Sequence, residues 1–177
     1  MTRLRSAQHL ALQAALVEMR EATNLNQRDF ATRLGRNKSF VWRIEVGERR
    51  AQVVELIEIS WAAGFSPPSV IQRIQSREPL VARAESRIEV PIGLRLRAFM
   101  ARTLIEEIVK AREAAARSKR GLSAEIGRSD SYVWKIEERR RLDVIEFLTL
   151  ANALSFNAAN VVGMVARATV ARAAADT

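Results

Sequence analysis

The sequence contains an internal duplication, and this feature limits the folds open to the chain more than any other. Residues 12–45 match residues 104–137 at a constant offset of 92, and thirteen of these 34 positions are identical. The segment Ser39-Phe-Val-Trp-Arg-Ile-Glu, for example, recurs as Ser131-Tyr-Val-Trp-Lys-Ile-Glu. After this stretch the offset falls to 91. Self-similarity of this kind predicts two copies of one structural unit.

Both copies have the pattern of helices and almost no strand signal. Apolar residues recur at helical spacing, and Gly35, Gly47, Gly64 and Ser66-Pro-Pro separate the periodic stretches of the first copy. We expect helices near residues 6–22, 27–34, 38–46, 52–63 and 67–75, and again near residues 93–115, 119–126, 130–138, 143–154 and 157–172. The predicted fold class is all-α, with two tandem five-helix domains at residues 1–75 and 93–177. Residues 76–92 are the expected linker, and whether residues 80–87 form a helical turn stays open.

Two sets of apolar residues are assigned to the core. The first lies on the fourth helix of each copy and consists of Val54, Leu56, Ile57, Trp61, Ile145, Phe147, Leu148 and Leu150. The second is a stripe near the C-terminus, Val161, Val162, Val165 and Ala168. For this stripe, completion of the core and self-association into a homodimer are the two interpretations.

The charge of the chain favours a polyanionic partner. The sequence has 29 Lys and Arg against 20 Asp and Glu, a net charge of +9, and residues 1–88 and 89–177 carry +5 and +4 of it. A positive field attracts phosphates, so nucleic acid is the favoured partner and an anionic membrane is the second candidate. No apolar run approaches the roughly 18 to 20 residues needed to span a bilayer. Arg3 and Arg5 precede an apolar stretch, but its polar residues at helical spacing favour an amphipathic first helix and a cytoplasmic protein over a signal peptide.

The chain has no cysteine and one histidine, His9. Thiolate metal sites and thiol nucleophiles are excluded, and a histidine-rich metal site cannot be assembled. A Ser-His-Asp arrangement would depend on a residue in the first turn of the chain. The sequence therefore predicts a protein that is not an enzyme and has no metal and no cofactor.

In each copy a very short turn joins the second and third helices, at residues 35–37 and 127–129. This is helix-turn-helix spacing. The glycine that opens each turn permits a left-handed conformation. Ala31 and Ser123 put a small side chain where the two helices cross, and Asn37 and Ser129 are expected to cap the third helix.

The third helix of the first copy presents Lys38, Ser39, Trp42 and Arg43 outward. In a major groove these side chains can meet base edges, while Arg36 and backbone amides meet phosphates. Trp42 and Trp134 occupy matching positions, and two interpretations stay open for them. They either pack in the core, or face outward to stack on DNA or on a partner protein.

These segments resemble the Xre, Cro and lambda-repressor class of helix-turn-helix transcription regulators over about 60 residues of each copy. The resemblance rests on Asn26-Gln-Arg-Asp-Phe-Ala-Thr-Arg-Leu-Gly with Ile44-Glu-Val-Gly-Glu-Arg-Arg, and on Leu122-Ser-Ala-Glu-Ile-Gly with Lys135-Ile-Glu-Glu-Arg-Arg-Arg. It implies that the residue at Gln27 contacts phosphate and that the positions of Lys38, Ser39 and Arg43 read bases.

The resemblance has two further implications. The arginines after the third helix, Arg49, Arg50, Arg139 and Arg140, are expected to contact phosphate. Helix one is tied to the end of helix three by ion pairs of Arg20 with Glu45 and of Arg112 with Glu137, 25 residues apart in both copies.

The second copy departs from the pattern. Lys119 stands where Gln27 does, and Asp130 replaces Lys38. Asp130 can accept a hydrogen bond from cytosine N4 or repel the DNA backbone, so whether this copy reads bases stays open. We therefore expect phosphate-facing charges that match between the copies and base-facing charges that do not. The candidate DNA-binding residues are Gln27, Arg28, Arg36, Asn37, Lys38, Ser39, Trp42, Arg43, Arg49, Arg50, Lys119, Arg120, Arg128, Ser129, Asp130, Ser131, Trp134, Lys135, Arg139 and Arg140.

The resulting hypothesis is a DNA-binding transcription regulator, a repressor in the first instance, that uses two helix-turn-helix units of one chain as a pseudo-dimer on operator DNA. Its partners are duplex DNA and, as further candidates, RNA polymerase or another regulator. The alternative is a protein-interaction module, an antiactivator or adaptor, built from duplicated helix-turn-helix domains with weak DNA binding.

Overall fold

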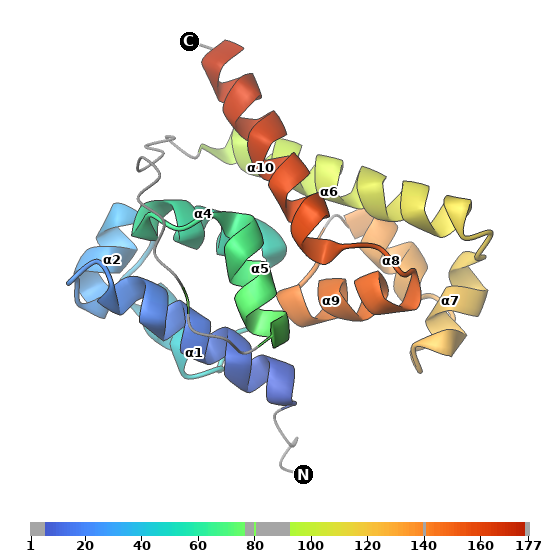
Figure 1. Ribbon diagram of the computed structural model, residues 1–177, viewed down its shortest axis with the longest axis horizontal. Helices are drawn as coiled ribbons and strands as arrows, with labels where there is room; N and C mark the ends of the chain where they lie inside the picture. Colours follow the sequence, from blue (N-terminus) through green and yellow to red (C-terminus); the bar gives the residue numbers. More distant parts are fainter. Residues whose placement is uncertain (1–5, 77–79, 81–92, 140, 176–177) are drawn as a thin grey trace. The chain divides into compact units, whose positions relative to one another are not determined.

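The computed structural model describes residues 6–76, 80, 93–139 and 141–175. In this part of the chain every regular element is an α-helix, which confirms the all-α class (Figure 1). The chain separates into two compact units. Unit 1 comprises residues 1–51 and 55–89, and unit 2 comprises residues 52–54 and 90–177. Apart from Ser76 and Leu80, the expected linker lies outside the described residues.

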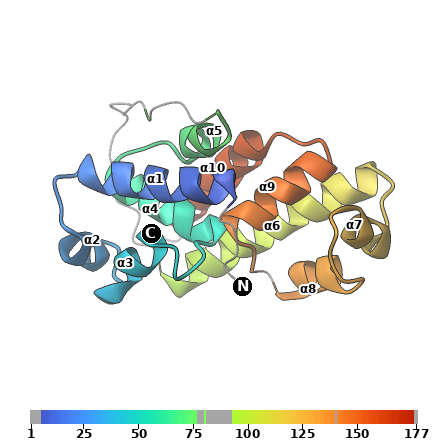
Figure 2. The ribbon, with the colours of Figure 1, turned by 90° about the horizontal axis from the view of Figure 1, so that it is seen from below.

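The helices of the first copy are α1 (Ala7–Glu21), α2 (Gln27–Arg33), α3 (Ser39–Glu45), α4 (Val53–Ala63) and α5 (Pro67–Ser76). They belong to unit 1, except that Val53 and Val54 at the start of α4 are assigned to unit 2. Each bound lies within one residue of the sequence prediction. Helices α1 and α2 begin where expected because Ser6 and Asn26 accept hydrogen bonds from the free amides of their first turns. Helix α1 packs against both α5 and α3, and so lies between α5 and the α2–α3 pair (Figure 2).

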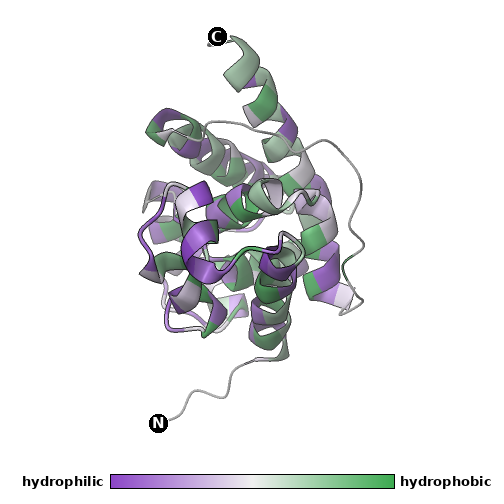
Figure 3. Cartoon of the chain, turned by 90° about the vertical axis from the view of Figure 1, so that its left-hand side faces the viewer, coloured by the Kyte–Doolittle hydropathy of each residue, from purple (hydrophilic) through white to green (hydrophobic). Residues whose placement is uncertain are grey.

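The core of unit 1 forms beneath α2 and α3. Phe30, Val41 and Ile44 are buried there, and Leu56 and Ile57 of α4 are fully buried. Burial of each such side chain stabilises the fold by roughly 1.5 to 3 kcal/mol. Trp61 is buried as predicted, whereas Val54 is only half-buried. The helices carry apolar and polar residues on different faces (Figure 3), as the periodicity predicts.

Unit 2 repeats this order with α6 (Leu94–Ala114), α7 (Lys119–Glu125), α8 (Tyr132–Arg139), α9 (Val144–Ala153) and α10 (Ala158–Ala175). Most bounds again agree with the prediction; α8 begins two residues later and α10 ends three residues later than expected. Helix α7 follows the C-terminal end of α6, and α10 crosses α6 (Figure 1).

The C-terminal stripe belongs to the core of unit 2. Val162 and Val165 of α10 are fully buried, while Val161 and Ala168 are half-buried. Of the fourth-helix residues, Phe147, Leu148 and Leu150 are fully buried and Ile145 is half-buried. Completion of the core is therefore confirmed for the buried members of both sets.

The short turns between α2 and α3 and between α7 and α8 each use a left-handed glycine, as predicted. The φ angle is +62° at Gly35 and +66° at Gly127. A side chain at either residue would be strained by the backbone conformation itself, although no atom lies within 4 Å of the position that a Cβ would take. The glycines are needed for the turn and not for close packing.

The predicted caps of the third helices are wrong. The N-cap of α3 is Lys38, one residue later than predicted, and its backbone angles are helical. No side chain caps this helix. The side-chain oxygen of Asn37 instead accepts from the Ser39 hydroxyl at 3.1 Å, and its backbone carbonyl accepts from the Phe40 amide. The cause is the shortness of the turn, which leaves residue 37 one position too early to act as a side-chain cap.

In unit 2 a residue of α7 takes over the capping role. The Ser123 hydroxyl accepts from the buried amide of Val133 at 3.1 Å and donates to the carbonyl of Lys119. The amide of Tyr132 donates to the backbone carbonyl of Ser129. The Ser129 hydroxyl therefore caps neither the Tyr132 amide nor the Val133 amide. Ser123 is thus more than a small residue at a crossing, because it ties α7 to the start of α8.

No helix of the described ranges is long and apolar enough to cross a membrane.

Candidate nucleic-acid interface

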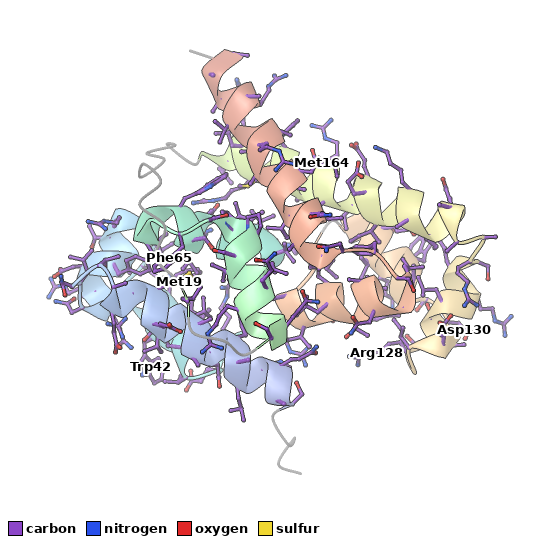
Figure 4. All side chains as sticks on the ribbon, in the orientation of Figure 1. Met19, Trp42, Phe65, Arg128, Asp130 and Met164 are labelled. Atoms are coloured by element: carbon purple, nitrogen blue, oxygen red, sulfur yellow. The ribbon has the colours of Figure 1, made fainter. Side chains whose placement is uncertain are left out.

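Helix α3 has one buried and one exposed face. Val41, Ile44 and Glu45 face inward. The four residues predicted to face outward are all exposed; they are Lys38, Ser39, Trp42 and Arg43. Trp42 is 42% exposed, so the interpretation that placed it in the core is wrong (Figure 4). Trp42 therefore lies on the exposed face of α3 together with Lys38, Ser39 and Arg43.

Helix α8 has the same division of faces. Val133 and Ile136 are buried, and Trp134 is 48% exposed. The other candidates on and before this helix are exposed as well; they are Ser129, Asp130, Ser131 and Lys135. The duplication has therefore preserved an outward tryptophan in both units.

Buried ion pairs hold the third helix of each unit. The Nε atom of Arg20 lies 2.7 Å from Oε1 of Glu45, and Arg112 makes the same contact with Glu137 at 2.7 Å. Each arginine also donates to a backbone carbonyl of the loop that follows its own helix, that of Leu25 or Arg117. The predicted pairs are confirmed, and they fix helix one to the end of helix three.

The first residue of the second helix joins the same cluster. Nε2 of Gln27 donates to Glu45 at 2.6 Å, and Nζ of Lys119 lies 2.7 Å from Glu137. Both side chains are partly exposed. Their phosphate contact stays a prediction, but each also has a structural partner within its own unit.

Unit 1 contains a cluster that the sequence analysis missed. Arg36 lies 2.9 Å from the buried carboxylate of Glu58, and Arg49 makes two hydrogen bonds to the buried carboxylate of Glu55 at 2.6 and 2.9 Å. The two guanidinium groups lie 5.0 and 5.1 Å from the centre of the Phe40 ring. The cluster attaches the start of α3 to α4.

The sequence held a signal for this cluster. Glu55 and Glu58 are three residues apart on an otherwise apolar helix, and a buried carboxylate needs a cation. Arg36 and Arg49 are the cations that the short loops bring within reach. Their first role in the structure is to hold the fold.

The corresponding region of unit 2 has a different set of contacts. Thr149 stands where Glu58 does at the offset of 91, so Arg128 has no acidic partner among the described residues. Arg128 is exposed (Figure 4), and its guanidinium lies 5.2 Å from the centre of the Tyr132 ring. Burial, together with a hydrogen bond to Glu146, raises the pKa of Tyr132 above its ordinary value. Arg36 and Arg128 are thus the same residue type in different environments, and their contact with phosphate stays a prediction.

Asp130 is not an isolated negative charge. Its Oδ2 atom lies 2.9 Å from Nε of Arg120, and both side chains are largely exposed. In unit 1 the corresponding residues are Lys38 and Arg28, two cations. The structure thus places a neutral ion pair where the first copy carries two positive charges.

The remaining candidates are distributed as follows. Arg28 and Lys38 are exposed and make no ion pair with any described residue, and Arg43 makes a long contact with Glu48 at 3.8 Å. Arg50 is exposed. The side chain of Arg139 and the whole of Arg140 lie outside the described part of the chain.

No group of three His, Asp or Glu residues that could hold a metal ion occurs in the ranges described. His9 lies in the first turn of α1, where its Nδ1 atom is 2.9 Å from the Ser6 hydroxyl. Comparison with protein-family models, with curated proteins and with solved structures gives no match to the chain.

Proposed function

We propose that this protein is a DNA-binding transcription regulator composed of two tandem five-helix helix-turn-helix domains. The observation that carries the proposal is the repeated outward face of α3 and α8. In each unit one face of the third helix is buried, and the opposite face exposes a tryptophan together with polar and basic residues. This division of faces is what a helix needs in order to enter a major groove while the rest of its unit stays folded.

Charge and chemistry support duplex DNA as the partner. Arg28, Lys38 and Arg43 surround the exposed face of α3, and the whole chain has a net charge of +9. Lysine and arginine can donate to guanine O6 and N7 or to phosphate oxygens. Trp42 offers a flat apolar surface to a deoxyribose or a thymine methyl group. A binding role in the cytoplasm, with no catalytic step and no cofactor, follows from this proposal.

The two units act together as a pseudo-dimer. Half-sites on one face of DNA recur at about 34 Å. A chain segment of about 17 residues, the length of the expected linker, can span at most roughly 60 Å. Because Lys38 of one unit corresponds to Asp130 of the other, the two half-sites differ in sequence. Repression is the expected outcome, because a protein bound across a promoter excludes polymerase without any further contact.

Selection of bound sequences from random duplex DNA tests the proposal. The expected result is enrichment of a composite site with two unequal halves, about 10 base pairs apart from centre to centre. Binding to the enriched duplex should weaken steeply as salt is raised, because phosphate contacts release counterions. Absence of enrichment together with salt-independent binding would contradict the proposal.

One observation favours a second candidate, a protein-interaction module that acts as an antiactivator or adaptor. Unit 2 exposes Trp134 on the same helix-turn-helix as the neutral pair of Arg120 with Asp130. An exposed aromatic residue on the same surface as a neutral ion pair suits a protein partner better than a polyanion. If Trp134→Ala abolishes binding to RNA polymerase or to another regulator and leaves DNA binding unchanged, this candidate is supported for unit 2.

A further inference from the structure

We propose that the two units hold DNA phosphates with cations at different positions of the repeat. Unit 1 uses Arg28 at the start of α2, and unit 2 uses Arg128 in the turn. The matching residues, Arg120 and Arg36, are withheld from DNA by acidic neighbours. This inference rests on the proposed DNA binding and adds to it the residues through which each unit makes contact.

In unit 1 the turn arginine is engaged inside the protein. Arg36 donates to Glu58 at 2.9 Å, and the Glu58 side chain is only 3% exposed. Moving Arg36 to a phosphate would leave a buried carboxylate without its cation. Arg28, in contrast, is exposed and makes no ion pair with the described residues. A phosphate that approaches α2 therefore meets Arg28 as an available cation.

In unit 2 the arginine of the second helix is the one with an acidic partner. Arg120 is the counterpart of Arg28, and its Nε atom lies 2.9 Å from the carboxylate of Asp130. Only Nε of Arg120 contacts Asp130, so a phosphate that binds the other N–H donors of Arg120 lies beside this carboxylate, and repulsion between the two anions offsets the gain from the contact. Asp130 acts as an internal counter-anion that neutralises the α7 position.

The turn arginine of unit 2 is correspondingly available. Thr149 replaces Glu58, so no buried carboxylate draws Arg128 inward. The guanidinium lies over the Tyr132 ring, 5.2 Å from its centre. Stacking of this kind orients the group while its N–H donors remain in the plane of the guanidinium, directed away from the ring. Arg128 is thus oriented and still able to bind a phosphate.

Two sequence differences between the copies explain why the available arginine is on the second helix in unit 1 and in the turn in unit 2. One places Asp130 where Lys38 stands, which neutralises the cation on the second helix. The other places Thr149 where Glu58 stands, which releases the cation in the turn. Together they keep a cation for phosphate in each unit but change its position, and hence the way in which each unit approaches the DNA backbone.

The test uses four variants of the full chain and the salt dependence of DNA binding. Each phosphate contact contributes about 0.9 to the slope of log affinity against log salt. We expect Arg28→Ala and Arg128→Ala each to lower this slope by about one and to weaken binding several-fold at low salt. Arg120→Ala and Arg36→Ala should leave the slope unchanged. Thermal unfolding of each variant separates loss of contact from loss of fold. If Arg36→Ala is unfolded at the working temperature, Arg36→Gln takes its place.

Asp130→Asn is the variant for which we expect stronger binding to phosphate. Removal of the counter-anion should raise the salt slope by about one, and adding Arg120→Ala to this variant should cancel the increase. Equal losses in Arg28→Ala and Arg120→Ala would overturn the inference, as would a lower slope in folded Arg36→Ala or Arg36→Gln. A fall in affinity of Asp130→Asn for the selected duplex would overturn it too, because Asp130 would then be reading a base. If the unaltered chain shows no salt-dependent binding at all, the proposed function fails first.

Discussion

At the scale of single residues, arginine occurs in two separate environments in this protein. Arg20 and Arg112 are buried in ion pairs that hold helices together, whereas Arg28 and Arg43 are exposed near the outward face of α3. The residue type alone does not distinguish these roles. The position of the nearest carboxylate does, because a buried carboxylate fixes the arginine that neutralises it.

Arg20→Ala should destabilise unit 1 more than Arg112→Ala destabilises unit 2. Loss of one partner from a buried pair costs roughly 3 to 5 kcal/mol. Glu45 would keep only a neutral donor, Gln27, whereas Glu137 would keep the positive charge of Lys119. Chemical denaturation of the two variants measures the difference. Equal losses would mean that Lys119 does not replace the missing charge.

Tyr132→Phe should lower the stability of unit 2 at neutral pH by about 0.5 to 1.5 kcal/mol, the net value of one hydrogen bond. The folded-state pKa of Tyr132 is raised by burial and by Glu146, so the folded protein keeps a proton that the unfolded chain loses above its ordinary pKa of about 10. The contribution of Tyr132 is therefore complete below pH 10 and is lost as the pH rises beyond it. Unfolding free energies across this range should converge for the two proteins, and a constant difference would contradict the assignment.

Arg43→Ala should relax the base preference at one position of the selected site and weaken binding by roughly 1 to 3 kcal/mol, the range for a good bidentate base contact. Arg43 is exposed on α3, and its contact with Glu48 is long, at 3.8 Å. Glu48→Ala is the matched control, because it removes that neighbour and keeps the cation. Competition among duplexes that differ at single positions provides the measurement. Uniform weakening on every duplex would assign Arg43 to phosphate.

At the scale of helices, the sequence predicts where elements lie better than it predicts how they are joined. Periodicity and glycine positions gave the bounds of α1 to α5 to within one residue, because those signals are local. The caps of α3 and α8 were wrong because they depend on the angles of one turn residue and on a hydroxyl from another helix. Likewise, the contacts of Arg36 and Asp130 depend on residues distant in sequence or on side-chain direction, which periodicity does not report.

Ser123→Ala should lower the stability of unit 2 by about 1 kcal/mol, the usual cost of losing a helix cap. The Ser123 hydroxyl satisfies the buried amide of Val133, and no other group is positioned to replace it among the contacts described. Ser131→Ala is the matched control, since this exposed serine lies at the same junction. Melting curves of the two variants test the assignment. Equal melting temperatures would show that the hydroxyl contributes nothing to the α7–α8 junction.

At the scale of the whole chain, the proposed function implies that the duplication turns two weak binders into one stronger one. Two linked units bind as if the second were present at an effective concentration set by the linker, without any new contact. Such a gain requires both units to reach their half-sites at once. Differences between the units, such as Lys38 against Asp130, then give the composite site a direction on the DNA that a symmetric dimer would lack.

Spacing between the half-sites should therefore control affinity. Inserting about five base pairs, half a helical turn, moves the second half-site to the opposite face of the DNA. Inserting a full turn restores the face but doubles the separation of the half-sites to roughly 68 Å, which lowers the effective concentration of the second unit at its half-site. Both insertions should reduce affinity toward that of one unit on its own half-site, as measured by titration against duplexes of each length. Affinity that does not change with spacing would show that one unit alone holds the DNA, and the other unit would then be free for a protein partner.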